Sequence, residues 1–307
     1  MHQFLKSIVI FSIILILFYV LSLCIWGDLI PRYLNKNLNY RIASYGHSYT
    51  RFNEVKNVKN VDILFLGSSH SYRGFDGRMF EKSGYTTFNL GSSAQTPLQT
   101  EILLKRYLKT LKPKMVVYEV FPPTFNIDGV ESSMDIISND INDKYSLKLA
   151  VKQQHLAVWN TLIYGFYRDY FNKNKKIGEN KNKNNDTYIS GGFVAQKLQY
   201  YKKIQYVKDT LFFNDSQLYQ FKENIKLIQK QNIKIILVQA PITPLRYKSY
   251  TNNDYFDKKM TNIGTYYNFN KIISLNDSLH FFDDNHLNQN GVILFNHAFI
   301  KKLQSKN

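Results

Sequence analysis

Two kinds of hydrophobic pattern divide this chain. Near the amino terminus, residues 8–26 form one apolar run without a charged side chain. From residue 61 onward, the apolar positions fall instead into short runs and helical stripes that alternate along the chain. The first pattern predicts a membrane-spanning helix, because about 20 residues in a helix cross the hydrocarbon core. The second pattern predicts strands that alternate with amphipathic helices.

Five short apolar runs are predicted to be strands, and most of them end near a glycine or a proline, as buried strands usually do. They are residues 61–66, 86–90, 115–118, 234–238 and 271–275. Apolar side chains at helical spacing predict the main helices. These are residues 99–111, 215–231 and 289–303. Together the elements predict an α/β fold, a three-layer α/β/α sandwich whose parallel sheet is covered on both faces.

The same pattern sets the predicted domain boundaries. Residues 1–26 are expected to be a transmembrane anchor, 27–60 a juxtamembrane linker, and 61–304 one folded domain. The gap between the third and fourth strands is far longer than an ordinary crossover, so residues 126–213 are predicted to be a helical insert. Within the insert, the Lys- and Asn-rich tract at 172–185 is expected to be a solvated loop rather than a ligand site.

The apolar run has two interpretations, an uncleaved anchor or a cleaved signal peptide. The run is longer than the apolar region of a typical signal peptide, and no small-residue cleavage site follows Trp26, which favours the anchor. The charges that flank the apolar run argue against placing the large domain outside the cytoplasm. Lys6 precedes the run, whereas Arg32, Lys36 and Arg41 follow it, so the positive-inside rule would leave the large domain in the cytoplasm.

Composition excludes several classes of protein. The 307 residues are 44% hydrophobic, which is enough for a packed core and excludes wholesale disorder. The single cysteine excludes a disulfide framework and a cysteine-rich zinc site, and neither a metal nor a cofactor is predicted. The net charge of +17 comes from dispersed Lys and Arg without a nucleic-acid-binding motif. Nucleic acid is therefore not expected as a partner, and the basic surface suits anionic polymers or lipid headgroups.

Three polar segments carry the candidate chemistry. Residues 67–70 read Gly-Ser-Ser-His directly after the first strand, where a tight turn presents a serine outward. Gly91 follows the second strand, where a glycine lets a backbone N–H approach a substrate. Asp283 and His286 precede the final helix, and an Asp three residues before a His can orient the imidazole while it activates a hydroxyl. Each segment alone also fits an ordinary turn or polar loop.

In combination, the three segments resemble the SGNH hydrolases, also called GDSL-type esterases, over residues 61–303. The resemblance implies a flavodoxin-like arrangement of sheet and helices. It also implies that Ser69 is the nucleophile, His286 the base and Asp283 its orienting carboxylate. The implied oxyanion hole consists of the backbone N–H groups of Ser69 and Gly91.

The chain departs from the family pattern at two positions. Ser68 stands where the family has an Asp before the nucleophile, and the third strand ends at Glu119 where the family supplies an Asn. One oxyanion donor is therefore expected to be missing or replaced, which can cost on the order of 10²–10³ in rate. Ser68, His70 and Glu119 are expected to line the site.

The Gly-Ser-Ser segment is similar to that of membrane-anchored members, such as the D-alanine transfer protein of teichoic acid synthesis and alginate acetylation proteins. This similarity implies an extracytoplasmic esterase or O-acyltransferase acting on cell-envelope or exported polysaccharide. The implied partners are an acylated or acceptor polysaccharide, membrane lipid around the anchor, and a membrane acyltransferase. The alternative left open is a catalytically degenerate domain that binds acylated glycan or scaffolds a membrane acyltransferase.

Overall fold

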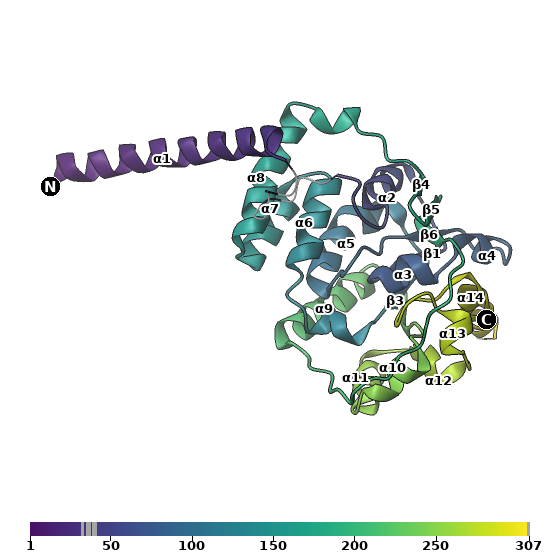
Figure 1. Ribbon diagram of the computed structural model, residues 1–307. Helices are drawn as coiled ribbons and strands as arrows, with labels where there is room; N and C mark the ends of the chain where they lie inside the picture. The colour runs from purple at the N-terminus through teal and green to yellow at the C-terminus, as the bar shows by residue number, and fades with distance from the viewer. Residues whose placement is uncertain (32–33, 35–37, 39–41, 306–307) are drawn as a thin grey trace.

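The computed structural model describes residues 1–31, 34, 38 and 42–305. A long apolar helix, α1 (His2–Leu29), projects from an α/β domain (Figure 1). The centre of that domain is a parallel sheet of five strands in the order β2-β1-β3-β7-β8. The strands are β1 (Ile63–Leu66), β2 (Thr87–Asn89), β3 (Met115–Glu119), β7 (Lys234–Gln239) and β8 (Tyr266–Asn268). The predicted α/β/α architecture is confirmed.

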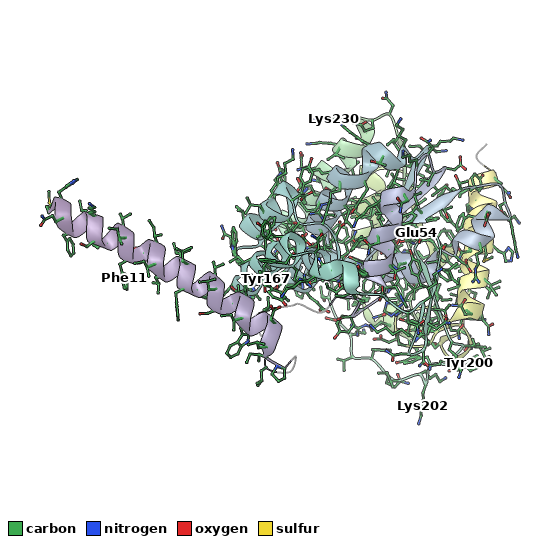
Figure 2. The ribbon with its side chains drawn as sticks, turned by 90° about the horizontal axis from the view of Figure 1, so that it is seen from above. Phe11, Glu54, Tyr167, Tyr200, Lys202 and Lys230 are labelled. Atoms are coloured by element: carbon green, nitrogen blue, oxygen red, sulfur yellow. The ribbon has the colours of Figure 1, made fainter. Side chains whose placement is uncertain are left out.

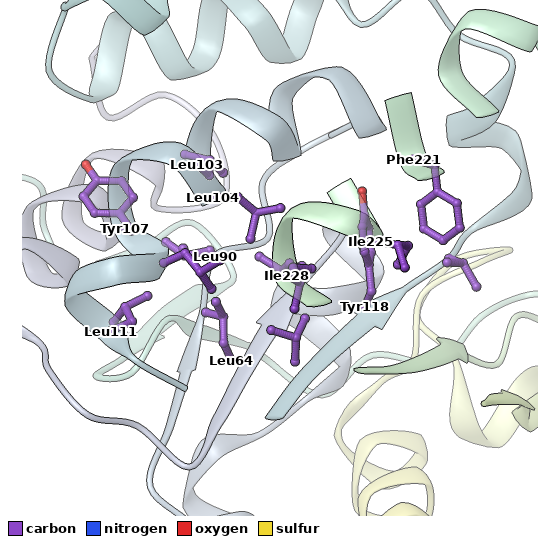
Figure 3. Packing of buried hydrophobic residues seen from close by; sticks show 14 of the residues in the cluster. Leu64, Leu90, Leu103, Leu104, Tyr107, Leu111, Tyr118, Phe221, Ile225 and Ile228 are labelled. Carbon is purple, nitrogen blue, oxygen red and sulfur yellow. The ribbon is translucent and has the colours of Figure 1, made fainter. Parts of the chain in front are cut away.

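Every residue of β1 is buried, because helices cover both faces of the sheet. Side chains alternate between the two faces, so Leu64 and Leu66 enter one core while Ile63 and Phe65 enter the other. The first core lies under α5 (Pro97–Leu111) and α9 (Asp215–Gln229), whose apolar stripes meet the sheet in Figure 3. The second core lies under α4 (Gly77–Glu81) and α14 (Gln289–Gln304) and is rich in phenylalanine. Each such side chain contributes roughly 1.5–3 kcal/mol by leaving water.

Helix α5 begins and ends where its sequence dictates. Thr96 and Gln99 form a capping box, and Pro97 occupies the first turn, where its missing N–H costs nothing. The helix ends at Lys112, which adopts a left-handed conformation just before Pro113. This helix runs from the carboxyl end of β2 back to the amino end of β3, so β1, β2 and β3 are parallel and their carboxyl ends share one edge of the sheet.

Four of the five predicted strands are confirmed, and the fifth is wrong. Residues 271–275 do not form a strand; the edge strand is β8, and α12 (Phe269–Ile272) follows it directly. Asn268 starts that helix by accepting a hydrogen bond from the N–H of Asn270. Strand β8 escaped notice because an edge strand needs little burial, and Tyr266 is only half-buried, with its hydroxyl bonded to Gln239.

The insert between β3 and α9 is only partly helical. Its helical elements are η3 (Pro122–Phe125), α6 (Val130–Asn139), α7 (Lys144–Gln153), α8 (Leu156–Tyr170) and η4 (Lys173–Lys176). A small antiparallel sheet follows, made of β4 (Asn182–Lys183), β5 (Asp186–Ile189) and β6 (Phe193–Gln196). The Lys- and Asn-rich tract contributes β4 and a buried carboxylate, Glu179, so the expectation of a solvated loop is wrong there.

The predicted linker is shorter than expected. Residues 48–57 form α2 (Ser48–Glu54) and η2 (Val55–Asn57), and Phe52 and Val55 are fully buried in the first core. Much of residues 32–41 lies outside the described part of the chain.

The remaining elements are short helices: α3 (Ser69–Gly74), α10 (Pro244–Ser249), α11 (Asn253–Ile263) and α13 (Asp277–His280).

Among the residues that the structure describes, α1 is the one helix long and apolar enough to cross a membrane. It extends beyond residues 8–26 at both ends. Its carboxyl-terminal part packs against α8, where Gly27 lies so close to the Tyr164 ring that a Cβ atom would come within 2.5 Å of it. The end of α1 is therefore packed tightly against the domain at this point.

Candidate active site

Ser69 is the first residue of α3, immediately beyond the carboxyl end of β1. The turn depends on Gly67, whose φ of +132° favours glycine and whose added Cβ would lie 2.8 Å from the Cβ of Glu119. Ser68 caps the helix by accepting a hydrogen bond from the N–H of His70. This geometry leaves the Ser69 side chain half-buried at the edge of the sheet.

The structure brings Ser69, His286 and Asp283 together from opposite ends of the chain. The Nε2 atom of His286 lies 2.7 Å from the Oγ atom of Ser69, 217 positions away in the sequence. The Nδ1 atom of His286 lies 2.8 Å from Oδ2 of Asp283. A hydroxyl, an imidazole and a carboxylate in this order can activate the hydroxyl as a nucleophile.

The loop between α13 and α14 fixes the carboxylate. Oδ1 of Asp283 accepts hydrogen bonds from the backbone N–H groups of Asn285 and His286, at 2.9 Å and 2.6 Å. Burial alone would raise the pKa of Asp283, but the hydrogen bond from His286 and the loop amides outweigh it and lower the pKa. The carboxylate is therefore charged at neutral pH and can stabilise a protonated imidazole.

Aromatic rings enclose the imidazole of His286 on both faces. The Phe282 ring is stacked on it at 5.4 Å between centroids and 7° between planes, and the His70 ring at 4.6 Å and 22°. Phe121 in turn lies 3.8 Å from the His70 ring. The orientation of His286 is thus set by ring packing as well as by its hydrogen bonds, and the sequence analysis had not identified Phe121 or Phe282.

Ser68, His70 and Glu119 form a second hydrogen-bonded set beneath the first. Oγ of Ser68 lies 3.1 Å from Nδ1 of His70 and 3.1 Å from Oε2 of Glu119. All three residues are buried, so they support the site from below rather than lining an open surface. Burial raises the pKa of Glu119 to about 8, and burial with the neighbouring His286 holds the pKa of His70 well below its usual value. This inner set is therefore uncharged at neutral pH.

The two N–H groups predicted to form the oxyanion hole have different surroundings. Ser69 N–H opens α3 and has no hydrogen-bond acceptor within the described residues, so it is available to a ligand. Gly91 N–H instead donates to Oδ1 of Asn89 at 2.9 Å, which corrects the expectation for Gly91. Asn89 is itself fixed, because its Nδ2 donates to the backbone oxygen of Ser71. A Cβ on Gly91 would lie 2.8 Å from the backbone oxygen of Ser68, so close packing alone accounts for the glycine.

The small sheet of the insert packs beside the site. Arg73, on α3, makes a two-point ion pair with Asp186 of β5, with both N–O distances 2.8 Å. Its guanidinium also lies 5.6 Å from the ring centroid of Phe282. A cavity of about 190 Å³ lies on the Arg73 side, lined by His47, Ser93, Glu179 and Lys183 among others. Among the described residues, no group of three His, Cys, Asp or Glu side chains is suited to a metal ion.

Comparison with known proteins found weak structural similarities, among them those to two Bacteroides proteins. No family model and no curated protein matches the chain. A "putative acylhydrolase" from Bacteroides fragilis covers 92% of this chain at 12% identity and a TM-score of 0.40, with 98% of its own length matched. A GDSL-like lipase from Bacteroides thetaiotaomicron covers 86% at 12% identity and a TM-score of 0.39, with 99% of its own length matched. At this level of similarity, neither protein's activity is transferred to this chain.

Proposed function

We propose that this protein is a serine-dependent esterase or acyltransferase. One observation carries the proposal: Ser69, His286 and Asp283 form a continuous hydrogen-bonded chain at the carboxyl edge of the parallel sheet. This arrangement is not expected of an ordinary polar surface loop: the imidazole lies between a carboxylate and a hydroxyl, and two rings stack on it.

The proposed reaction follows from these positions. The Oγ atom of Ser69 attacks the acyl carbon of an ester while Nε2 of His286 accepts the hydroxyl proton. Asp283 stabilises the resulting imidazolium, and Ser69 N–H donates to the oxygen that becomes negative. The alkoxide leaving group takes the proton from His286, which leaves an acyl group on Ser69. Water or an acceptor hydroxyl then attacks this ester by the reverse sequence and restores the serine.

We further propose that the chain is anchored by α1 and that its domain handles acyl groups of polysaccharide outside the cytoplasm. The resemblance to membrane-anchored SGNH proteins motivates this finer proposal. The cavity beside Arg73 is lined by polar and charged side chains that can bond to sugar hydroxyls, although none of the triad residues lines it. His47 contributes two buried ring nitrogens that have no hydrogen-bond partner in the described part of the chain.

A second candidate function is acyl-glycan binding or scaffolding without turnover. It is favoured by the bond between Gly91 N–H and Asn89, because an oxyanion hole with one donor stabilises a transition state less well. In that case, the inner set of Ser68, His70 and Glu119 would stabilise only the fold.

The two candidates are separated by labelling the full-length protein in detergent with a serine-directed phosphonate. The esterase proposal expects labelling at Ser69, slow cleavage of a small acetyl ester, and loss of both in Ser69→Ala and His286→Ala. Ser83→Ala removes a hydroxyl that bonds to the backbone oxygen of Met79, outside both the triad and the Arg73 cavity, and serves as the matched control. Acylated oligosaccharide formed from an added acceptor would indicate transfer. Wild-type protein that neither labels nor cleaves, yet retains acylated glycan, would establish the binding function instead.

A further inference from the structure

The base of α1 is fastened to α8 by specific contacts. Tyr19 donates a hydrogen bond to the side chain of Asn160 at 2.6 Å. Asp28 accepts hydrogen bonds from Tyr164 and Tyr167 at 2.9 Å and 2.6 Å and pairs with Lys173. These contacts fix where the helix leaves the domain.

The part of α1 that precedes its buried contact has the length of a bilayer's hydrocarbon core. Side chains from His2 to Ser22 are exposed or half-buried, although Tyr19 already bonds to Asn160, and burial against the domain begins at Leu23 and Cys24. The stretch from His2 to Ser22 rises roughly 30 Å at 1.5 Å per residue, which equals the usual hydrocarbon thickness. If this stretch spans, the membrane surface falls at the contact with α8.

Exposed and half-buried aromatic side chains lie near the carboxyl-terminal ends of α1 and α8. We define the junction aromatics as Trp26, Phe166, Tyr167, Tyr170 and Phe171. Tyr170 is 82% exposed and Phe171 58% exposed, and adjacent exposed rings are more informative than single ones. Three of them form a connected group, because the Phe171 ring lies 5.0 Å from that of Tyr170 and 5.1 Å from that of Tyr167.

The arrangement of the helices brings this group toward the membrane side. Figure 1 shows α1 running away from the side of the domain formed by α7 and α8. Figure 2 shows from above that Tyr167 lies near the domain end of α1, from which the helix extends outward past Phe11. Tyrosine and tryptophan rings favour the membrane interface, because one part of each is apolar and another forms hydrogen bonds.

We propose that the junction aromatics insert into the headgroup region of the bilayer and hold α8 against the membrane surface. This inference rests on the proposed anchoring by α1. A bilayer fits better than a protein partner, because Tyr167 bonds to Asp28, only six residues beyond the exposed stretch of a membrane-length helix. The domain would then have a fixed orientation on the membrane instead of moving freely on a tether.

The test uses two variants of the full-length protein, each of which carries one fluorescent probe at a different position. Cys24→Ala removes the native thiol, and Tyr170→Cys or Tyr219→Cys then carries an environment-sensitive fluorophore. Tyr219 lies on α9 and is 65% exposed, so it is a matched control. The protein is reconstituted in phosphatidylcholine–phosphatidylglycerol vesicles that contain lipids with nitroxides near the headgroup or deep in the acyl chain.

The proposal expects the probe at position 170 to be quenched several-fold more than the probe at 219, and more by shallow than by deep nitroxides. Equal quenching at both positions in carbonate-resistant, membrane-bound protein would overturn the inference and leave the anchor intact. Protein that carbonate washes from the vesicles would overturn the anchor together with this inference. Quenching that depends on the density of protein in the vesicles, and not on the nitroxide lipid, would show that the junction aromatics contact a second copy of the chain. That result would also overturn the inference. Phosphonate labelling of Ser69 is scored separately, so failure of the esterase proposal is recognised independently.

Discussion

The imidazole rings of His70 and His286 are stacked face to face, with centroids 4.6 Å apart and planes inclined by 22°. His70 is held from behind by Ser68 and by the Phe121 ring, so it cannot swing away without disturbing the buried set. Since burial keeps His70 uncharged, it offers its π face to the imidazolium that the proposed reaction creates on His286. The base is thereby oriented without a competing positive charge.

Replacing His70 tests this orientation. His70→Ala removes the ring, and we expect kcat/KM for an acetyl ester to fall about 10- to 100-fold, since small misplacements of a catalytic group have effects of this size. His70→Phe keeps the stacked ring but loses the bond to Ser68, and its loss should be smaller. Thermal unfolding of both variants serves as the control for folding. Equal activity losses in the two variants would show that stacking does not position His286.

Removing the carboxylate should be less severe than removing the nucleophile. Asp283→Ala leaves the hydroxyl and imidazole in place, whereas Ser69→Ala removes the group that forms the acyl intermediate. We expect Asp283→Ala to retain about 10- to 100-fold more activity than Ser69→Ala, as the members of a triad act as a unit but do not contribute equally. The measurement is kcat for ester cleavage by each variant. A double variant that loses the product of the two single losses would contradict joint action.

The buried carboxyl of Glu119 should make stability depend on pH. Its pKa is about 8 in the folded protein, above its usual value, so the unfolded chain loses this proton first as pH rises. The contribution to the free energy of unfolding is full below the usual pKa, falls as pH rises toward 8, and is then constant; the total is a few kcal/mol. Glu119→Gln cannot ionise and keeps an oxygen that accepts from Ser68.

Urea unfolding between pH 5 and 9 measures this effect. The wild-type protein should lose stability relative to Glu119→Gln up to about pH 8, and the difference should then remain constant. A difference that is the same at every pH in this range would show that Glu119 is already ionised in the fold.

Gly91 should be required for packing even though its N–H does not face the site. Gly91→Ala places a Cβ within 2.8 Å of the backbone oxygen of Ser68 and 2.9 Å of the Ser71 side chain. We expect a loss of about 1–3 kcal/mol in the free energy of unfolding, which is typical of overpacking. Gly178→Ala is the control, because nothing lies within 4 Å of the Cβ that it adds. Unchanged stability in Gly91→Ala would show that this turn adjusts freely.

Much of the fold could be predicted because its signals are local. The apolar runs that became β1, β2, β3 and β7, and the stripes that became α5, α9 and α14, are all read from neighbouring positions. The turn at Gly67 and the spacing of Asp283 and His286 are local as well, so these candidate residues could be named without a structure. Strand β8 was missed for the corresponding reason: as a half-buried edge strand, it lacks a distinctive apolar run.

The tertiary structure decided which of these residues meet. The 2.7 Å contact between His286 and Ser69 closes a loop of 217 positions, and no pattern of neighbours encodes that distance. The same holds for the stacking of His70 on His286 and for the docking of α8 on α1. The direction of Gly91 N–H also depended on packing, because Ser71 and Asn89 from separate elements fix the acceptor that it binds. Periodicity and turn chemistry act over a few residues, whereas the geometry of the site depends on how distant elements pack.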